Sequence, residues 1–113
     1  MTIFVFQRGE TISLALDAVT GDPLSVTAIS AAMKAVAPGR TSVSAAAPVA
    51  AAFNITPRSA SGDVPPGWNL TVGAAQSALL PAGYYLADAR IEVGGGVIIT
   101  ESIGITLRES VTA

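Results

Sequence analysis

Short runs of alternating apolar and polar residues recur along the chain, and Gly, Pro, Asp or Ser bounds each run. Alternation with a period of two is typical of strands with one buried face, and several such runs separated by turn residues are typical of a sandwich or barrel. We therefore predict an all-β fold of about seven strands, arranged as an antiparallel sandwich. The expected strands are Ile3–Gln7, Thr11–Ala18, Val26–Val36, Val49–Thr56, Trp68–Val72, Tyr84–Val93 and Val97–Leu107.

The alternation also predicts which side chains point into the core. Successive side chains of a strand lie on opposite faces, so every second residue of a run shares one face. The more apolar set of each run is assigned to the core. The residues predicted to point inward are Ile12, Leu14, Leu16, Phe53, Ile55, Trp68, Leu70, Val72, Tyr85, Ala87, Ala89, Ile91 and Val93.

The run Val26–Val36 fits two patterns. Ile29, Met33 and Val36 form a helical stripe, whereas Ile29 and Met33 also fall on one face of an alternating strand. A helix here would be short and would stop at Pro38, and local helix propensity is overridden by a sheet context. We expect a strand.

The segments between the runs carry turn and loop signals. Thr20–Pro23 is expected to be a turn, and Gly94–Gly96 is expected to close a hairpin, because Gly adopts the backbone angles that tight turns need. Pro38–Pro48 and Ser59–Gly67 show no periodicity and are predicted to be surface loops. Gly73–Leu80 is predicted to be a single helical turn that connects two strands.

The last run contains a carboxylate in an otherwise apolar row. Glu101 has the same parity as Ile99, Ile103 and Leu107. Either a β-bulge near Ser102 shifts the register, or Glu101 lies at the rim of the core.

Two runs are apolar on both faces. In the first, Phe4 and Phe6 share one face and Ile3 and Val5 occupy the other; in the sixth, two apolar side chains fall on the outward parity. Such a strand is expected where a second surface covers it, and the alternative is that neighbouring loops do so. The predicted partner interface consists of Phe4, Phe6, Tyr84 and Leu86.

The length of the chain and the residue types that it lacks limit the functions that we expect. A chain of 113 residues is the size of one domain, so we expect residues 1–113 to form a single sandwich. The absence of His and Cys excludes the common nucleophile–base pairs and thiolate or imidazole metal sites, and we expect no catalytic residue, cofactor or metal. An enzyme would need a carboxylate pair from distant segments, such as Glu101 with Asp17 or Asp63.

The charge and hydropathy of the sequence exclude further classes of protein, namely nucleic-acid-binding and membrane-spanning ones. The net charge is −2 and the arginines are scattered, so no basic surface for nucleic acid is expected. No apolar stretch approaches the ~18 residues that a membrane-spanning helix requires, and the first residues lack the features of a signal peptide. Only 12% of residues are charged and 50% are hydrophobic, which suits a protein in lasting contact with neighbours, including copies of itself.

A set of turn and strand-edge motifs resembles the immunoglobulin-like domain of tailed-phage and prophage tail or baseplate proteins, such as the amino-terminal domain of baseplate upper proteins. The likeness covers nearly the whole chain, and it departs from the family at Leu24-Ser25-Val26-Thr27 and in the Ala-rich loop that follows Pro38. The matching motifs are Arg8-Gly9-Glu10-Thr11, Gly21-Asp22-Pro23-Leu24, Gly83-Tyr84-Tyr85, Asp88-Ala89-Arg90-Ile91 and Glu109-Ser110-Val111-Thr112.

The resemblance implies a virion component or adaptor of the tail or baseplate, made in the bacterial cytoplasm. Its expected partners are other tail or baseplate proteins and further copies of the chain in a symmetric ring, with no ligand chemistry of its own. The alternative is a receptor- or glycan-binding module that uses sandwich loops, with Trp68, Asn69 and Tyr84 in a shallow site.

Overall fold

The computed structural model describes residues 2–17 and 26–111. The predicted turn Thr20–Pro23 and Ala18, the expected end of the second strand, lie outside these ranges. Within them the chain forms β1 (Ile3–Gln7), β2 (Ile12–Asp17), β3 (Val26–Val36), β4 (Ala51–Ala52), β5 (Asn54–Arg58), β6 (Gly67–Val72), α1 (Ala74–Ala78), β7 (Gly83–Val93), β8 (Gly96–Ile99) and β9 (Ile103–Arg108).

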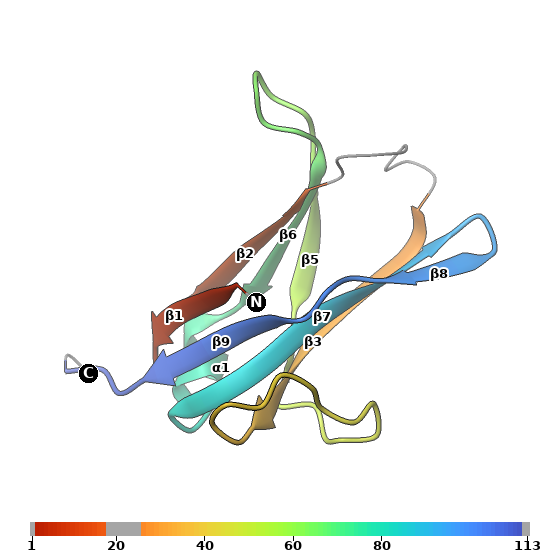
Figure 1. Ribbon diagram of the computed structural model, residues 1–113. Helices are drawn as coiled ribbons and strands as arrows, with labels where there is room; N and C mark the ends of the chain where they lie inside the picture. Colours follow the sequence, from red (N-terminus) through yellow and green to blue (C-terminus); the bar gives the residue numbers. More distant parts are fainter. Residues whose placement is uncertain (1, 18–25, 112–113) are drawn as a thin grey trace.

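The strands form two sheets that face each other, which confirms the predicted all-β sandwich. One sheet has the order β1-β9-β7-β3-β4, with β8 also paired to β7, and the other has the order β2-β6-β5. Figure 1 shows the sheets close together near α1 and diverging toward the top of the view. We call them the six-stranded and the three-stranded sheet.

The strand order is that of an immunoglobulin-like sandwich. In such folds strands B, E and D belong to one sheet and C, F and G to the other, and a further strand can extend the C edge. Here β2, β6 and β5 take the first set of positions, while β3, β7 and the β8–β9 arm take the second, with β4 beyond β3.

A tyrosine corner accompanies this topology. Tyr85 lies near the start of β7, almost fully buried, and its hydroxyl donates a hydrogen bond to the carbonyl of Pro81, four residues upstream, at 2.6 Å. A tyrosine at this place in the F strand, bonded to the preceding backbone, is a hallmark of the fold. Burial raises the pKa of the Tyr85 hydroxyl above its usual 10.0, and the nearby charge of Arg8 acts in the opposite direction.

The ambiguous run Val26–Val36 is a strand, as expected. It pairs with β7 along nearly its whole length, interrupted by one irregularity between Val26 and Ala28. This long pairing satisfies the backbone of the Ala-rich segment within the sheet, and Ala31 and Met33 enter the core.

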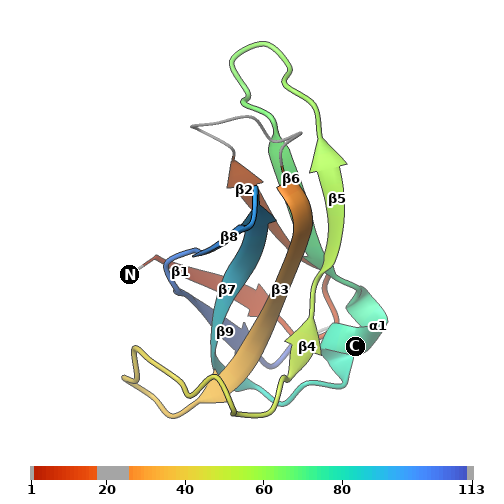
Figure 2. The ribbon, with the colours of Figure 1, turned by 90° about the vertical axis from the view of Figure 1, so that its right-hand side faces the viewer.

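Two predicted strands are each divided in the structure. The expected strand Val49–Thr56 becomes β4, which pairs with β3, and β5, which pairs with β6 in the other sheet. Figure 2 shows β5 following β4 along the chain and leading away from β3. Phe53 is the crossing residue between them: its N–H bonds the carbonyl of Ala31 at 2.9 Å and its side chain is buried. The crossing places one aromatic side chain between the sheets.

The last predicted strand is divided by a bulge, one of the two expected arrangements. Ile99 pairs with Arg90 and Ile103 pairs with Ala87, so three residues oppose two on β7. Within the bulge, Thr100 exchanges two hydrogen bonds of 2.9 Å with Ala89, one through its N–H and one through its Oγ1. Because of the bulge, the Ile99 side chain lies on the outer face of the sheet, whereas those of Ile103, Ile105 and Leu107 in β9 lie on the core face.

The pairing of β1 differs from the predicted antiparallel arrangement. β1 lies at the edge of the six-stranded sheet and runs parallel to β9, from the Ile3–Gly104 pair to the Gln7–Arg108 pair. Parallel neighbours need a long connection, and here almost the entire chain separates the two strands.

The core combines both sheets, and most of the residues predicted to point inward belong to it. Ile91 and Val93 are only partly buried, because the sheets diverge at that end. The core consists of Ile12, Leu14, Ala31, Met33, Ala51, Phe53, Leu70, Val72, Leu80, Tyr85, Ala87, Ala89, Ile105 and Leu107, with Phe6, Leu16, Ala50, Ile55, Trp68 and Ile103 packed against it.

Candidate partner interface

Two of the four predicted interface residues point into the sandwich. The register of β1 on β9 sets Phe4 beside Ile105 and Phe6 beside Leu107, on the core side of the sheet. Phe6 packs against the core, and Phe4 stays 38% exposed because it lies at the open side of the sandwich. Both phenylalanines therefore belong to the core face.

The outer face of β1 is the more exposed one. Ile3 and Val5 are 62% and 50% exposed. On this face Ile3 stands in one row with Gly104 and Leu86, and Val5 stands in the next row with Thr106 and Tyr84. Tyr84 is exposed, as predicted.

Leu86 is buried, which corrects the prediction that it belongs to an exposed interface. Its side chain is only 4% exposed although it lies on the outer face. Val43 and Ala45 of the loop after β3 line a hollow together with Leu86, and Lys34 Nζ bonds the carbonyls of Ser44 (3.3 Å) and Ala45 (2.8 Å). The Ala-rich loop covers Leu86, and Lys34 ties that loop to the sheet.

An apolar groove remains on the outer face, with a volume of about 230 Å³. It exists because Gly104 has no side chain to fill the row between Ile3 and Leu86. We call it the outer groove. Its lining is mainly apolar: Ile3, Val36, Ala37, Gly39, Arg40, Thr41, Tyr84, Tyr85, Leu86, Gly104, Ile105 and Thr106.

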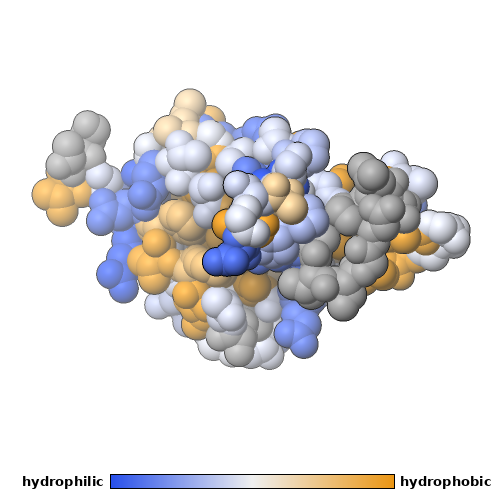
Figure 3. All heavy atoms as spheres, turned by 90° about the horizontal axis from the view of Figure 1, so that it is seen from above, coloured by the Kyte–Doolittle hydropathy of each residue, from blue (hydrophilic) through white to orange (hydrophobic). Residues whose placement is uncertain are grey.

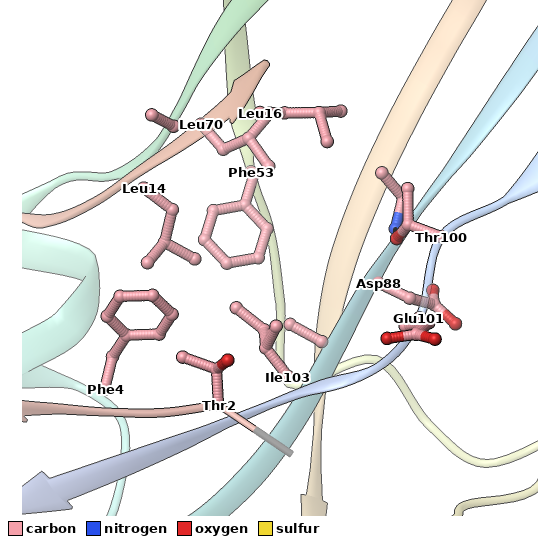
Figure 4. Close-up of a pocket in the computed structure, with 13 residues that line it drawn as sticks. Thr2, Phe4, Leu14, Leu16, Phe53, Leu70, Asp88, Thr100, Glu101 and Ile103 are labelled. Carbon is pink, nitrogen blue, oxygen red and sulfur yellow. Dashed lines mark hydrogen bonds between the residues drawn. The ribbon is translucent and has the colours of Figure 1, made fainter. Parts of the chain in front are cut away.

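A second cavity of about 190 Å³ opens between the two sheets (Figure 4). Its interior is formed by core side chains such as Phe4, Leu14 and Phe53, while Asp88 and Glu101 lie at one side of its mouth. Glu101 is thus at the rim of the core as well as in the bulge. Asp17 and Asp63, the predicted carboxylate partners of Glu101, do not line this cavity, and Asp17 forms an ion pair with Arg58.

The motif that opens with Arg8 has a structural role. The Arg8 guanidinium donates to the carbonyls of Leu80 (2.6 Å) and Ala78 (2.9 Å), at the end of α1, and pairs with Glu109 at 2.8 Å. A cation bonded to the last carbonyls of a helix is favourable. Arg8 thereby fastens the turn after β1 to the corner before β7.

The residues proposed for a glycan site are not brought together. Trp68 and Asn69 lie within β6 of the three-stranded sheet, and Trp68 packs against the core. Tyr84 lies on the outer face of the other sheet. The predicted loop site is therefore not formed by these three side chains.

The part of the chain that the structure describes contains no group of three His, Cys, Asp or Glu side chains placed to hold a metal ion. No helix in that part is long and apolar enough to cross a membrane.

The fold and the surface define an immunoglobulin-like sandwich with an apolar groove on its larger sheet. The sequence matches no protein-family model and no curated protein.

Proposed function

We propose that the protein is a non-enzymatic structural or adaptor domain of a bacteriophage or prophage tail or baseplate, and that it acts through protein–protein contacts. The observation that carries the proposal is the outer groove, where Ile3, Val5 and Tyr84 expose apolar surface around the gap at Gly104. Apolar patches on the surface of a small domain mark places where another protein binds.

The architecture of the groove supports binding of a protein side chain. Its floor is the fixed backbone of β9 and the buried Leu86, and one wall is the loop tied down by Lys34. A preformed apolar hollow costs little ordering when an apolar side chain of a partner enters it. The resemblance of the sequence to tail and baseplate domains supports the virion setting.

The proposal is tested by measuring mass by light scattering, for the protein alone over a range of concentrations and mixed with the products of neighbouring genes. We expect a complex with at least one tail or baseplate product. Val5→Asp places a charge beside the outer groove and should weaken that complex by tenfold or more, which is about 1.4 kcal/mol.

Leu79→Asp is the matched control, because Leu79 is 83% exposed at the C-terminal end of α1 and does not line the groove. It should bind as the unmodified protein does. A protein that forms no complex with any of these products, or a complex equally weakened by both substitutions, would contradict the proposal.

A further inference from the structure

β8 is an apolar edge strand, and within residues 2–17 and 26–111 no further strand pairs with its free edge. Its one neighbour among the described strands is β7, and Val97, Ile98 and Ile99 are each between 50% and 61% exposed. In Figure 3 apolar residues lie at the right-hand end, where the β7–β8 hairpin projects. Edge strands are normally blunted by charge, proline or cover, as β5 is by Pro57 and Arg58.

The apolar side chains of β8 occur on both of its faces. Val97 and Ile99 lie on the outer face, opposite Glu92 and Arg90 of β7, and Ile98 lies on the inner face. A strand that merely covers a core would be apolar on one face.

The backbone of β8 leaves a defined set of hydrogen-bonding groups unpaired. Gly96 pairs with Val93 across the two-residue turn, and the N–H of Thr100 bonds Ala89. Because hydrogen-bonded and non-hydrogen-bonded pairs alternate along an antiparallel ladder, the main chain of Ile98 faces β7. The N–H and C=O groups of Val97 and Ile99 therefore point away from the sheet, toward the free edge.

We propose that β8 is a homotypic docking edge: two copies of the protein pair their β8 strands antiparallel about a twofold axis at Ile98, which joins the two six-stranded sheets. Val97 of each copy lies opposite Ile99 of the other, and the two Ile98 side chains meet on the inner face. The inference builds on the proposed function, since it names one protein partner and the register of its contact.

The register follows from hydrogen bonding and from side-chain direction. Residues directly opposite each other in an antiparallel pair lie on the same face of the sheet. The twofold axis must therefore lie between one residue and its own copy, so that this residue pairs with itself. When the axis lies at Ile98, the free N–H and C=O groups of Val97 in each copy bond those of Ile99 in the other copy. This arrangement gives four hydrogen bonds. Centring on Val97 leaves Ile99 opposite the turn.

A second copy is the partner that the surface fits. Every side chain of the contact then meets an aliphatic one, and the flanking charged residues in each row, Glu92 of one copy and Arg90 of the other, have opposite signs. Three paired residues from each copy bury less than the ~1,000 Å² of a stable interface, so the contact is weak by itself and is strengthened by repetition in an assembly.

Cysteine cross-linking tests the register directly, because the natural sequence has no Cys. The Ile98 pair is of the non-hydrogen-bonded kind, with Cα atoms about 4.5 Å apart, and the Val97–Ile99 pair is about 5.5 Å apart. Both spacings are within the range that a disulfide spans. Ile98→Cys, Val97→Cys, Ile99→Cys and Leu79→Cys are oxidised under the same mild conditions, singly and with the Val97 and Ile99 variants mixed.

We expect Ile98→Cys to form disulfide dimers at least about tenfold faster than Leu79→Cys, because pairing raises the effective concentration of the two thiols. The mixture of Val97→Cys and Ile99→Cys should cross-link faster than either variant alone. Circular dichroism spectra of the reduced variants check that each is folded.

Cross-linking of Ile98→Cys at the rate of Leu79→Cys would overturn the inference, and so would equal rates for the mixture and its two components. These outcomes are separate from the test of the outer groove. A protein that binds a tail product through the groove without β8 cross-linking rejects only the homotypic edge, and the reverse result rejects only the groove.

Discussion

At the scale of single residues, the corner before β7 depends on the hydroxyl of Tyr85. Tyr85→Phe keeps the ring in the core but leaves the Pro81 carbonyl without its partner. We expect the free energy of unfolding to fall by about 1–2 kcal/mol, the cost of losing a part-buried hydrogen bond. Urea denaturation measures the change, and Tyr84→Phe, at an exposed position, should alter stability by less than about 0.5 kcal/mol.

The same hydroxyl makes stability depend on pH in the alkaline range. Burial raises the pKa of Tyr85 in the folded state above 10.0, so the unfolded chain releases this proton first as pH rises. The contribution is complete below pH 10 and is lost as pH rises above that value. Unfolding free energies measured from pH 8 to 11 should therefore decline more steeply for the unmodified protein than for Tyr85→Phe; parallel declines would contradict the assignment.

At the scale of elements, the turn between β7 and β8 sets the position of the free edge. Gly94 and Gly95 have φ of 53° and 82°, the positive values of a two-residue turn of the primed type. Gly94→Asn should be tolerated, because Asn is favoured at this position, whereas Gly94→Val should cost about 1–2 kcal/mol through backbone strain. Thermal denaturation of the two variants compares them, and equal midpoints would argue against this turn geometry.

The elements themselves were largely predictable from local pattern. Alternation identified the inward faces of β2, β6 and the first part of β7, because it depends only on which side of one strand meets the core. The prediction of a strand over Val26–Val36 is confirmed, and the parity of Glu101 indicates either a bulge or a place at the rim of the core. The inward faces and the parity of Glu101 are local information, because each depends on fewer than a dozen consecutive residues.

What the pattern missed depends on contacts between distant segments. Nothing within Ile3–Gln7 specifies β9 as a parallel neighbour, and the crossing at Phe53 needs two sheets to exist already. Leu86 has the parity of an exposed residue and is buried because Lys34 holds a distant loop over it. The most exposed apolar side chains of β1 are Ile3 and Val5, on the face opposite the phenylalanines.

At the scale of the whole molecule, the shared core predicts that the sheets unfold together. Trp68 packs against the core from the three-stranded sheet, so its fluorescence reports that sheet, while far-UV circular dichroism reports both. A single domain of this size is expected to unfold in one cooperative transition. The two signals should coincide in urea, and separate midpoints would contradict the prediction that residues 1–113 form one domain.

The parallel pairing of β1 and β9 determines how the sandwich responds to tension. The bonded region extends from Thr2, whose carbonyl accepts from Gly104, to the N–H of Arg8, which donates to Arg108, both at 2.8 Å. Force applied before β1 and after β9 pulls the two strands past each other lengthwise, so their hydrogen bonds share the load and must break together. An antiparallel pair at this place would lose its hydrogen bonds one at a time under the same force. The edge strand therefore acts as a mechanical clamp on the ends of the sandwich.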